Sequence, residues 1–179
     1  MQAKGGTVWF TGLHCSGKTT IANALAEKLR KNGVKLVVLD GDAVRKKISA
    51  DLGFSREDRN KHIKRVADIC ELISSNGVLN IACVASPTQE VRDYAKSSIR
   101  NFLEIFVKCP LEVCEQRDVK GHYKDAKAKK PGFETFLGIN LPYEEPKKPD
   151  LVLETDKESV QESAEKLYKK LVKEKWIVE

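Results

Sequence analysis

Eight residues near the amino terminus carry the clearest chemical pattern in the chain. Residues 12–19 read Gly-Leu-His-Cys-Ser-Gly-Lys-Thr, which fits the pattern G-x-x-x-x-G-K-[ST]. The glycines let the backbone curl so that successive N–H groups point at phosphate oxygens, and a following helix adds its positive end. Lys18 is expected to bridge the β- and γ-phosphates of a nucleotide, and the Thr19 hydroxyl to take a place on Mg²⁺. The pattern therefore predicts a nucleotide-phosphate site.

The variable positions of this loop have less certain chemistry. We interpret His14 as a residue at the rim of the site rather than a general base, because phosphoryl transfer depends more on positioning than on proton abstraction. Cys15 lies near a helix N-terminus, where a thiolate is favoured, but a structural cysteine is the expected role. The residues expected to contact the nucleotide here are Gly12, Leu13, His14, Cys15, Ser16, Gly17, Lys18, Thr19 and Thr20.

Two aspartates follow the second apolar run directly. Residues 40–42 read Asp-Gly-Asp, and in an open parallel sheet the ligand crevice lies at the carboxyl ends of the strands. Asp40 and Asp42 are therefore expected to face the phosphate loop. One carboxylate could hold Mg²⁺ through water, and the other could accept a proton from an attacking hydroxyl. The alternative is an Asp-Gly turn that only caps a helix.

The rest of the chain predicts the elements that must position these residues. Apolar runs of strand length alternate with stretches of helical periodicity, which is typical of parallel strands joined by covering helices. We expect an α/β fold with a mostly parallel five-stranded sheet, in one domain over residues 1–179. The expected strands are 7–11, 34–39, 78–84, 102–108 and 151–153, and the expected helices are 18–31, 56–75, 89–100, 111–117 and 157–173.

Residues 119–149 interrupt this rhythm. The segment is rich in Gly, Pro, Lys and Tyr and lacks periodicity. Compact domains seldom carry so long a loop unless it moves or binds. We interpret residues 119–149 as a lid over the predicted site, and call them the lid segment.

Charge and hydropathy exclude several other classes of protein. The net charge of +6 suits an enzyme that handles several phosphates, although nucleic acid attracts the same sign of charge. The lysines have little aromatic interleaving of the kind that stacks bases, so we expect no nucleic-acid partner. The apolar runs are too short to cross a bilayer, and the start of the chain lacks the layout of a signal peptide. We expect a cytoplasmic protein with no membrane partner.

Several blocks of sequence, taken in order, resemble the adenylylsulfate kinase family. They are residues 12–20, Leu-Asp-Gly-Asp at 39–42, Leu-Gly-Phe-Ser at 52–55 with Glu-Asp-Arg at 57–59, Ser-Pro at 86–87, Cys-Glu-Gln-Arg-Asp-Val-Lys-Gly at 114–121 and Pro-Tyr-Glu at 142–144. The resemblance covers nearly the whole chain. It implies a three-layer P-loop NTPase fold of the nucleoside-kinase type, a mobile lid and a homodimer. The implied reaction moves the γ-phosphate of ATP, with Mg²⁺, to the 3′-hydroxyl of adenosine 5′-phosphosulfate, a step of sulfate assimilation.

The resemblance also implies roles for individual residues. Asp42 becomes the catalytic base beside Lys18, and Thr19 and Asp40 hold the metal. Ser86 matches a serine that is often labelled a phosphoserine intermediate, although direct in-line transfer requires no covalent step. The expected contacts with the adenylylsulfate come from Asp40, Arg45, Phe54, Arg59, His62, Ser86, Lys120 and Phe136, and Arg117 is expected on the nucleotide. Phe54 and Phe136 would sandwich the adenine, and the lid would start from residues 117–120 and close through 136–139.

The chain departs from the family pattern at three places. His62 stands where the family commonly has asparagine, Glu134 stands about where many members have a substrate-binding lysine, and Asn140 ends the usual F-T-G-I-D block. A carboxylate would repel a phosphosulfate, so either Lys129 or Lys130 takes over or the acceptor is different. Two alternatives remain open: the same reaction on another nucleotide, such as cytidine diphosphoramidate, or a nucleotide-binding module that does not turn over.

Overall fold

A parallel sheet of five strands forms the centre of the computed structural model, which describes residues 1–178. The strands are β2 (Gly6–Thr11), β3 (Leu36–Asp40), β4 (Leu79–Cys83), β5 (Phe102–Lys108) and β6 (Leu151–Glu154). Their order is β3-β4-β2-β5-β6, and every neighbouring pair is parallel. All five strands therefore end at the same edge of the sheet, and the loops that follow them meet there.

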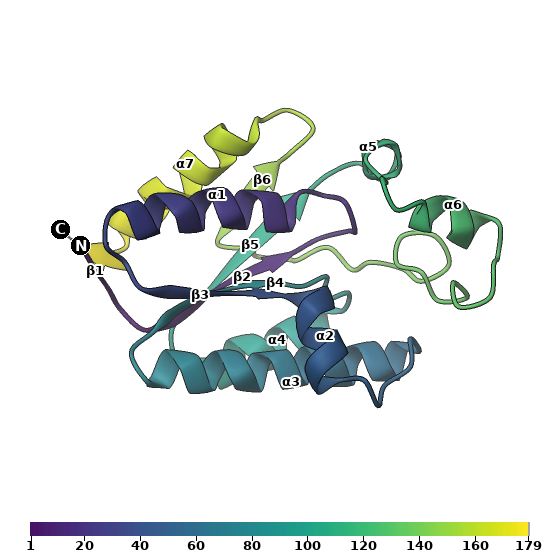
Figure 1. The fold of residues 1–179 in the computed structure, drawn as a ribbon, viewed down its shortest axis with the longest axis horizontal. Coiled ribbons are helices and arrows are strands. Elements are labelled where there is room, and N and C mark those ends of the chain that lie inside the picture. Colours follow the sequence, from purple (N-terminus) through teal and green to yellow (C-terminus); the bar gives the residue numbers. More distant parts are fainter. Residues whose placement is uncertain (179) are drawn as a thin grey trace.

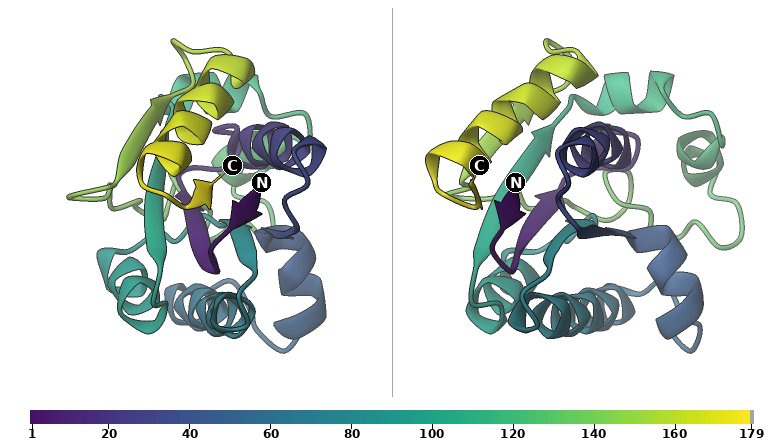
Figure 2. Two further views of the ribbon diagram at one scale, coloured as in Figure 1. Left: turned by 90° about the vertical axis from the view of Figure 1, so that its left-hand side faces the viewer. Right: turned by 60° about the vertical axis from the view of Figure 1, so that its left-hand side comes forward.

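Helices cover both faces of the sheet, which gives three layers (Figures 1 and 2). One face carries α1 (Lys18–Lys31) and α7 (Val160–Lys173), and the other carries α3 (Arg56–Ser75) and α4 (Gln89–Ser98). Successive side chains of β2 pack on opposite faces of the sheet. Val8 and Phe10 belong to the core cluster with α1 and α7, and Trp9 belongs to the cluster with α3 and α4. The predicted α/β fold and its parallel sheet are confirmed.

Three features of the fold lie outside the predictions. A short helix, α2 (Gly41–Ile48), follows β3 directly, and a second, α6 (His122–Lys127), lies within the lid segment. Near the termini, β1 (Gln2–Ala3) pairs antiparallel with β7 (Ile177–Val178). None of the residues of α2 is fully buried, and Val44 packs against the core only partly buried, so this short helix has no long apolar stripe that periodicity could detect.

The helix boundaries follow from capping side chains. The last helix begins at Val160 rather than at the predicted residue 157, because Ser159 and Glu162 form a capping box. Simple N-caps begin two other helices: the Asp40 side chain accepts from two backbone N–H groups of α2, and the Ser55 hydroxyl accepts from the N–H of Asp58 in α3. No helix within residues 1–178 is both long and apolar enough to cross a membrane.

The lid segment has a small core of its own, contrary to the expectation of a segment without regular structure. Tyr123 and Ala126 of α6 are buried together with Phe136, against Cys114 of the short helix α5 (Leu111–Gln116). The expected mobility of the segment stays a prediction.

Candidate active site

The phosphate loop joins β2 to α1 in a shape that requires glycine. Gly12 has a φ of 147°, and a Cβ at this position would lie 2.5 Å from the carbonyl oxygen of Val107. Gly17 precedes α1 with a φ of 100°. Within residues 1–178, no side chain caps the first turn of α1, so its N–H groups are available to an anion.

Lys18 lies curled inside this loop. Its ammonium donates to the carbonyl oxygens of Gly12 (3.0 Å) and Leu13 (2.5 Å). Burial lowers the pKa of the Lys18 ammonium. A cation held by carbonyl dipoles in this position can exchange them for phosphate oxygens when a nucleotide binds.

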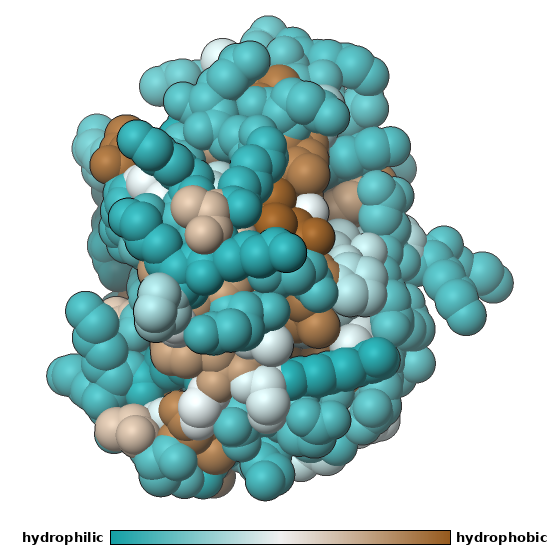
Figure 3. All heavy atoms as spheres, turned by 90° about the vertical axis from the view of Figure 1, so that its right-hand side faces the viewer, coloured by the Kyte–Doolittle hydropathy of each residue, from teal (hydrophilic) through white to brown (hydrophobic). Residues whose placement is uncertain are grey.

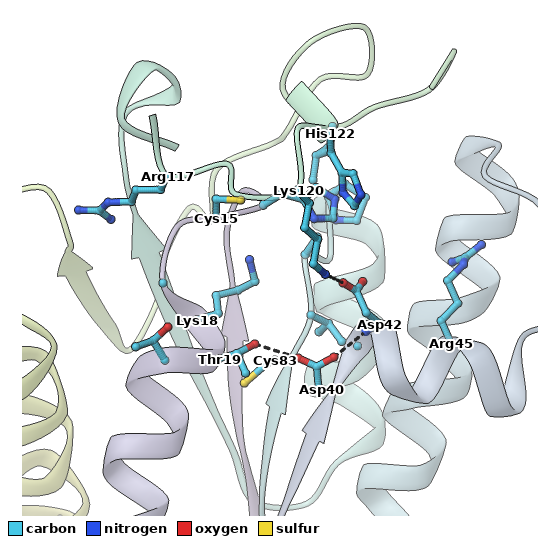
Figure 4. A pocket seen from close by; sticks show the side chains of 18 of the residues that line it. Cys15, Lys18, Thr19, Asp40, Asp42, Arg45, Cys83, Arg117, Lys120 and His122 are labelled. Carbon is cyan, nitrogen blue, oxygen red and sulfur yellow. Dashed lines mark hydrogen bonds and ion pairs between the residues drawn. The ribbon is translucent and has the colours of Figure 1, made fainter. Parts of the chain in front are cut away.

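The two carboxylates of residues 40–42 have different surroundings (Figure 4). Oδ2 of Asp40 accepts a hydrogen bond from the Thr19 hydroxyl over 2.9 Å, while Oδ1 accepts from the N–H groups of Asp42 and Ala43, each at 3.1 Å. Asp40 therefore caps α2 and faces the phosphate loop at once. Asp42 lies in the first turn of α2, and its Oδ2 lies 4.0 Å from the ammonium of Lys120 in the lid segment.

An arginine joins the opposite wall of the site to the lid segment. Arg59 of α3 donates from Nε to the carbonyl oxygen of Phe54 (3.0 Å) and from Nη2 to that of Thr135 (2.7 Å). The hydroxyl of Thr135 also donates to the Phe54 carbonyl, over 2.6 Å. Burial and the charge of Arg45 lower the pKa of Arg59 to about 10. The guanidinium groups of Arg45 and Arg59 lie 4.7 Å and 5.4 Å from the centre of the Phe54 ring.

The aromatic residue of the lid segment packs on the phosphate loop. The rings of Phe136 and His14 stack with centroids 5.0 Å apart and an interplanar angle of 25°. Tyr123 meets Phe136 edge-on and donates its hydroxyl to the carbonyl oxygen of His14 over 2.9 Å. Burial and the charge of Lys18 lower the pKa of His14 to about 3, so the ring is neutral near pH 7. An adenine sandwiched between Phe54 and Phe136 stays a prediction.

These groups line one cavity of about 1210 Å³ at the carboxyl edge of the sheet. Figure 3 looks onto this end of the molecule, where apolar atoms gather in a hollow framed by hydrophilic side chains. Arg117 lies on the side of the cavity opposite Arg45 (Figure 4), and its Nη2 donates to the carbonyl oxygen of Thr155 over 2.7 Å. The predicted residues that line the cavity are His14, Cys15, Gly17, Lys18, Thr19, Thr20, Asp40, Asp42, Arg45, Phe54, Arg59, His62, Arg117, Lys120 and Phe136.

Comparison with known proteins identifies the family. The family model described as "Adenylylsulphate kinase" matches residues 4–154. The chain belongs to the adenylylsulfate kinase family. The adenylyl-sulfate kinase of Picosynechococcus sp. is 48% identical over 171 residues, which are 96% of each chain. The probable adenylyl-sulfate kinase of Synechocystis sp. is 48% identical over 177 residues, 99% of each chain. The structure of Mycobacterium tuberculosis APS kinase in complex with AMPPNP and APS matches with a TM-score of 0.89 and 39% identity, over 95% of this chain and 99% of that one.

One residue that the family resemblance placed in the site lies elsewhere. Ser86 is fully buried, with a φ of 37°, and does not line the cavity. Its Oγ accepts from Nε1 of Trp9 (3.1 Å) and donates to Oγ1 of Thr11 (2.8 Å). This hydroxyl is enclosed and has two hydrogen-bond partners, so the structure does not place Ser86 in the cavity with the other predicted catalytic and substrate-binding residues.

Three residues of the phosphate loop also lie behind the cavity wall. Ser16 is fully buried and Gly12 and Leu13 do not line the cavity, so these residues can reach a nucleotide only through their backbone. Burial raises the pKa of the Cys15 thiol, which disfavours a reactive thiolate.

Several cavity residues were missed in the sequence. Thr155 follows β6 at the carboxyl edge and donates its hydroxyl to the carbonyl oxygen of Ser16 over 2.9 Å. The rule that sites gather at strand ends would have found it. Lys46 and His122 lie on the two unpredicted helices, α2 and α6, and Phe133 belongs to the part of the lid segment expected to lack structure.

Glu134, one of the lid-segment residues that depart from the family pattern, does not place its carboxylate in the cavity. Oε1 of Glu134 accepts from the N–H of Gly132 over 3.0 Å, and Glu134 does not line the cavity. Lys130 pairs with Asp125 over 2.7 Å, and Lys129 also lies outside the lining. The expectation that Lys129 or Lys130 replaces the family lysine is therefore not met in this structure. The cationic side chains that line the cavity are Lys18, Arg45, Lys46, Arg59, Arg117 and Lys120.

Proposed function

We propose that this protein transfers the γ-phosphate of ATP to the 3′-hydroxyl of adenosine 5′-phosphosulfate. The observation that carries the proposal is the placement of Asp42 in the same cavity as Lys18 of the phosphate loop and Arg59 of the opposite wall. Membership of the adenylylsulfate kinase family over most of the chain supports this acceptor. The six cations of the lining suit two substrates that both carry negative charge.

In the proposed reaction the residues mainly position and stabilise charge. The N–H groups of the phosphate loop and Lys18 hold the β- and γ-phosphates. The carboxylate of Asp42 accepts the proton of the 3′-hydroxyl, while the oxygen of that hydroxyl bonds to the γ-phosphorus. The bond from that phosphorus to the β–γ bridging oxygen breaks, which releases ADP. Lys120 and Arg117 offset the negative charge of the transferring group and the nucleotide.

The site also suits Mg²⁺, which we propose is held by Thr19 and Asp40. Their oxygens lie 2.9 Å apart, beside the place expected for the β- and γ-phosphates. Among the described residues no cluster of three or more His, Cys, Asp or Glu side chains could hold a metal. A small set of protein oxygens fits an ion that keeps several waters and takes phosphate oxygens as its other ligands. Bound Mg²⁺ would neutralise charge on the phosphates.

We further propose that residues 119–149 act as a lid within one kinase domain. The support is the set of contacts that the segment makes with the phosphate loop through Tyr123 and with the opposite wall through Thr135. A homodimer and a cytoplasmic location remain predictions from the sequence, and sedimentation velocity would test the first.

The acceptor is tested by incubating the protein with Mg·ATP and adenosine 5′-phosphosulfate. We expect ADP and a 3′-phosphorylated product in equal amounts, and a folded protein that forms neither would contradict the proposal. A panel of nucleotides that includes cytidine diphosphoramidate, compared by kcat/KM, tests the alternative acceptor. A preference of orders of magnitude for adenosine 5′-phosphosulfate would exclude that alternative.

A further inference from the structure

The carboxyl end of the lid segment is fastened to the strand that leads into the phosphate loop. The hydroxyl of Tyr143 lies 2.9 Å from Oγ1 of Thr11, the last residue of β2 and the neighbour of Gly12. The Tyr143 ring stacks on Phe106 of β5, with centroids 6.0 Å apart and an interplanar angle of 22°. Thr11 is fully buried, and neither Thr11 nor Tyr143 lines the cavity of the candidate active site. The contact therefore lies behind the phosphate loop.

The bonding of the Thr11 hydroxyl shows which group donates. Its single proton goes to the carbonyl oxygen of Ala85 over 2.8 Å, and its oxygen accepts from Oγ of Ser86 over 2.8 Å. One acceptor position remains on this oxygen, and the Tyr143 hydroxyl fills it as a donor. Burial raises the pKa of Tyr143, which keeps the donated proton in place. The lid segment thus supplies one of the three partners of the Thr11 hydroxyl.

Glu144 fastens the same end of the lid segment to two helices. Its backbone N–H donates to the carbonyl oxygen of Pro87 over 2.8 Å, and its Oε2 accepts from the N–H of Gln89, the first residue of α4, over 2.7 Å. Its Oε1 lies 3.3 Å from Nη2 of Arg56, the first residue of α3. Both side chains of this ion pair are about half exposed, so the pair itself contributes little. We call residues 143–144 the anchor.

The residues just before the anchor are held differently. The backbone N–H groups of residues 138–141 all donate to the carbonyl oxygens of Phe136 or Leu141, inside the lid segment itself. The same stretch borders a second cavity of about 530 Å³, which residues 106–111 also line. The fixed part of the chain therefore begins at the anchor rather than before it.

We propose that Tyr143 is a positioning residue, which holds the carboxyl end of the lid segment on the sheet so that residues 119–141 move about a fixed point behind the phosphate loop. The inference narrows the proposed lid and rests on the proposed function for its effect on catalysis. A closing lid excludes water from the reacting groups and completes the site. Misplacing a group at the site by about 1 Å can cost on the order of a hundredfold in rate. Loss of the anchor should therefore slow transfer to the acceptor and admit water.

Two substitutions form a matched pair for this inference. Tyr143→Phe and Ser86→Ala each remove one hydroxyl that donates to Thr11, but only Tyr143 belongs to the lid segment. Tyr143→Phe keeps the ring that stacks on Phe106, so the protein should still fold. If the bond to Thr11 had only a structural role, the two variants would behave alike.

The kinetic test measures ADP and the 3′-phosphorylated product together. With Mg·ATP and adenosine 5′-phosphosulfate, we expect Tyr143→Phe to lower kcat roughly tenfold and to form about twice as much ADP as product. In the extra turnover a water oxygen bonds to the γ-phosphorus and loses a proton to solvent, while the bond to the β–γ bridging oxygen breaks, which gives ADP and inorganic phosphate. Ser86→Ala should keep kcat within a few-fold and form ADP and product in equal amounts. A Tyr143→Phe variant that matches Ser86→Ala in both measurements would overturn the positioning role.

Amide hydrogen exchange in the free protein tests the anchor without any substrate. The N–H of Glu144, which donates to Pro87, should exchange at least about threefold faster in Tyr143→Phe and less than about twofold faster in Ser86→Ala. The amides of α7 report any loss of overall stability and serve as the internal control. Equal acceleration at Glu144 in the two variants, or none in Tyr143→Phe, would overturn the anchor even if the acceptor is correct. If the protein fails to turn over adenosine 5′-phosphosulfate, the proposed function fails, and the exchange result still decides the anchor.

Discussion

The hydroxyl of Thr19 donates a hydrogen bond of 2.9 Å to Oδ2 of Asp40, whose other oxygen caps α2. Asp40→Asn should keep the cap, because asparagine caps as well as aspartate, but it removes the charge proposed to attract Mg²⁺. We expect this variant to need more Mg²⁺ for half-maximal activity, measured by titrating Mg²⁺ at fixed ATP. The control, Asp40→Ala, should in addition lose about 1 kcal/mol of unfolding free energy in urea. An unchanged Mg²⁺ midpoint in Asp40→Asn would contradict the metal assignment.

The assignment of Asp42 as the base predicts a loss of rate without a loss of binding. Asp42→Asn should lower kcat by roughly 10²–10⁴, the usual contribution of a positioned general base. Its side chain is 71% exposed and its only ion pair, within residues 1–178, is the 4.0 Å contact with Lys120, so folding should be unaffected. Nucleotide affinity, measured by equilibrium titration, should stay the same. Retention of kcat within tenfold would remove Asp42 from this role.

The burial of Ser86 predicts a structural variant that remains active. Ser86→Ala should keep kcat within a few-fold, because the hydroxyl does not line the cavity. It should lower the free energy of unfolding by roughly 1–3 kcal/mol, since Nε1 of buried Trp9 loses its acceptor. Urea unfolding and steady-state kinetics on one preparation measure both. A hundredfold loss of kcat in a protein of undiminished stability would restore a chemical role for Ser86.

These contrasts show which features the sequence predicts and which it conceals. The parallel sheet was predictable because its three central strands, β4, β2 and β5, are almost entirely buried and all five strands read as apolar runs. Asp40 and Asp42 were placed at the site because they follow such a run. In contrast, α2 is short and none of its residues is fully buried, so it leaves little periodic pattern, although Asp40 is an ordinary capping residue. Ser86 turned inward because of a left-handed backbone conformation that residue type does not reveal.

The link between Arg59 and Thr135 was also beyond sequence reasoning. The two residues are 76 positions apart, and the acceptor is a backbone carbonyl, which every residue carries. Residue identities at 59 and 135 therefore give no sign of the pairing. It depends on how the lid segment folds around α6, an element that the lack of long periodicity concealed.

Two histidines, His62 buried and His14 half-buried, predict the direction of the pH dependence of stability. The pKa of His14 falls to about 3 and that of His62 to about 4, against 6.5 for an ordinary histidine. Between pH 6.5 and pH 4 these histidines bind more protons in the unfolded chain than in the folded one. The free energy of unfolding therefore falls as the pH falls from 6.5 towards 4. Urea midpoints at a series of pH values measure this loss. His14→Phe keeps a ring to stack on Phe136 but takes no proton, and should lose less stability over the interval than the parent. An equal loss would show that His14 does not contribute.

The last prediction concerns the carboxylate that stands near the family's usual lysine. Glu134 bonds to the N–H of Gly132 and does not line the cavity, so Glu134→Lys should change KM for adenosine 5′-phosphosulfate by less than about threefold. Arg59→Ala is the matched comparison, because Arg59 lines the cavity and joins Phe54 to Thr135. It should raise that KM at least about tenfold, since it removes both a charge and the link to the lid segment. If Glu134→Lys instead lowered KM by an order of magnitude, residue 134 would have to face the acceptor in the substrate complex. The lid segment would then have to rearrange from the arrangement found in the free protein, with the bond between Glu134 and Gly132 broken.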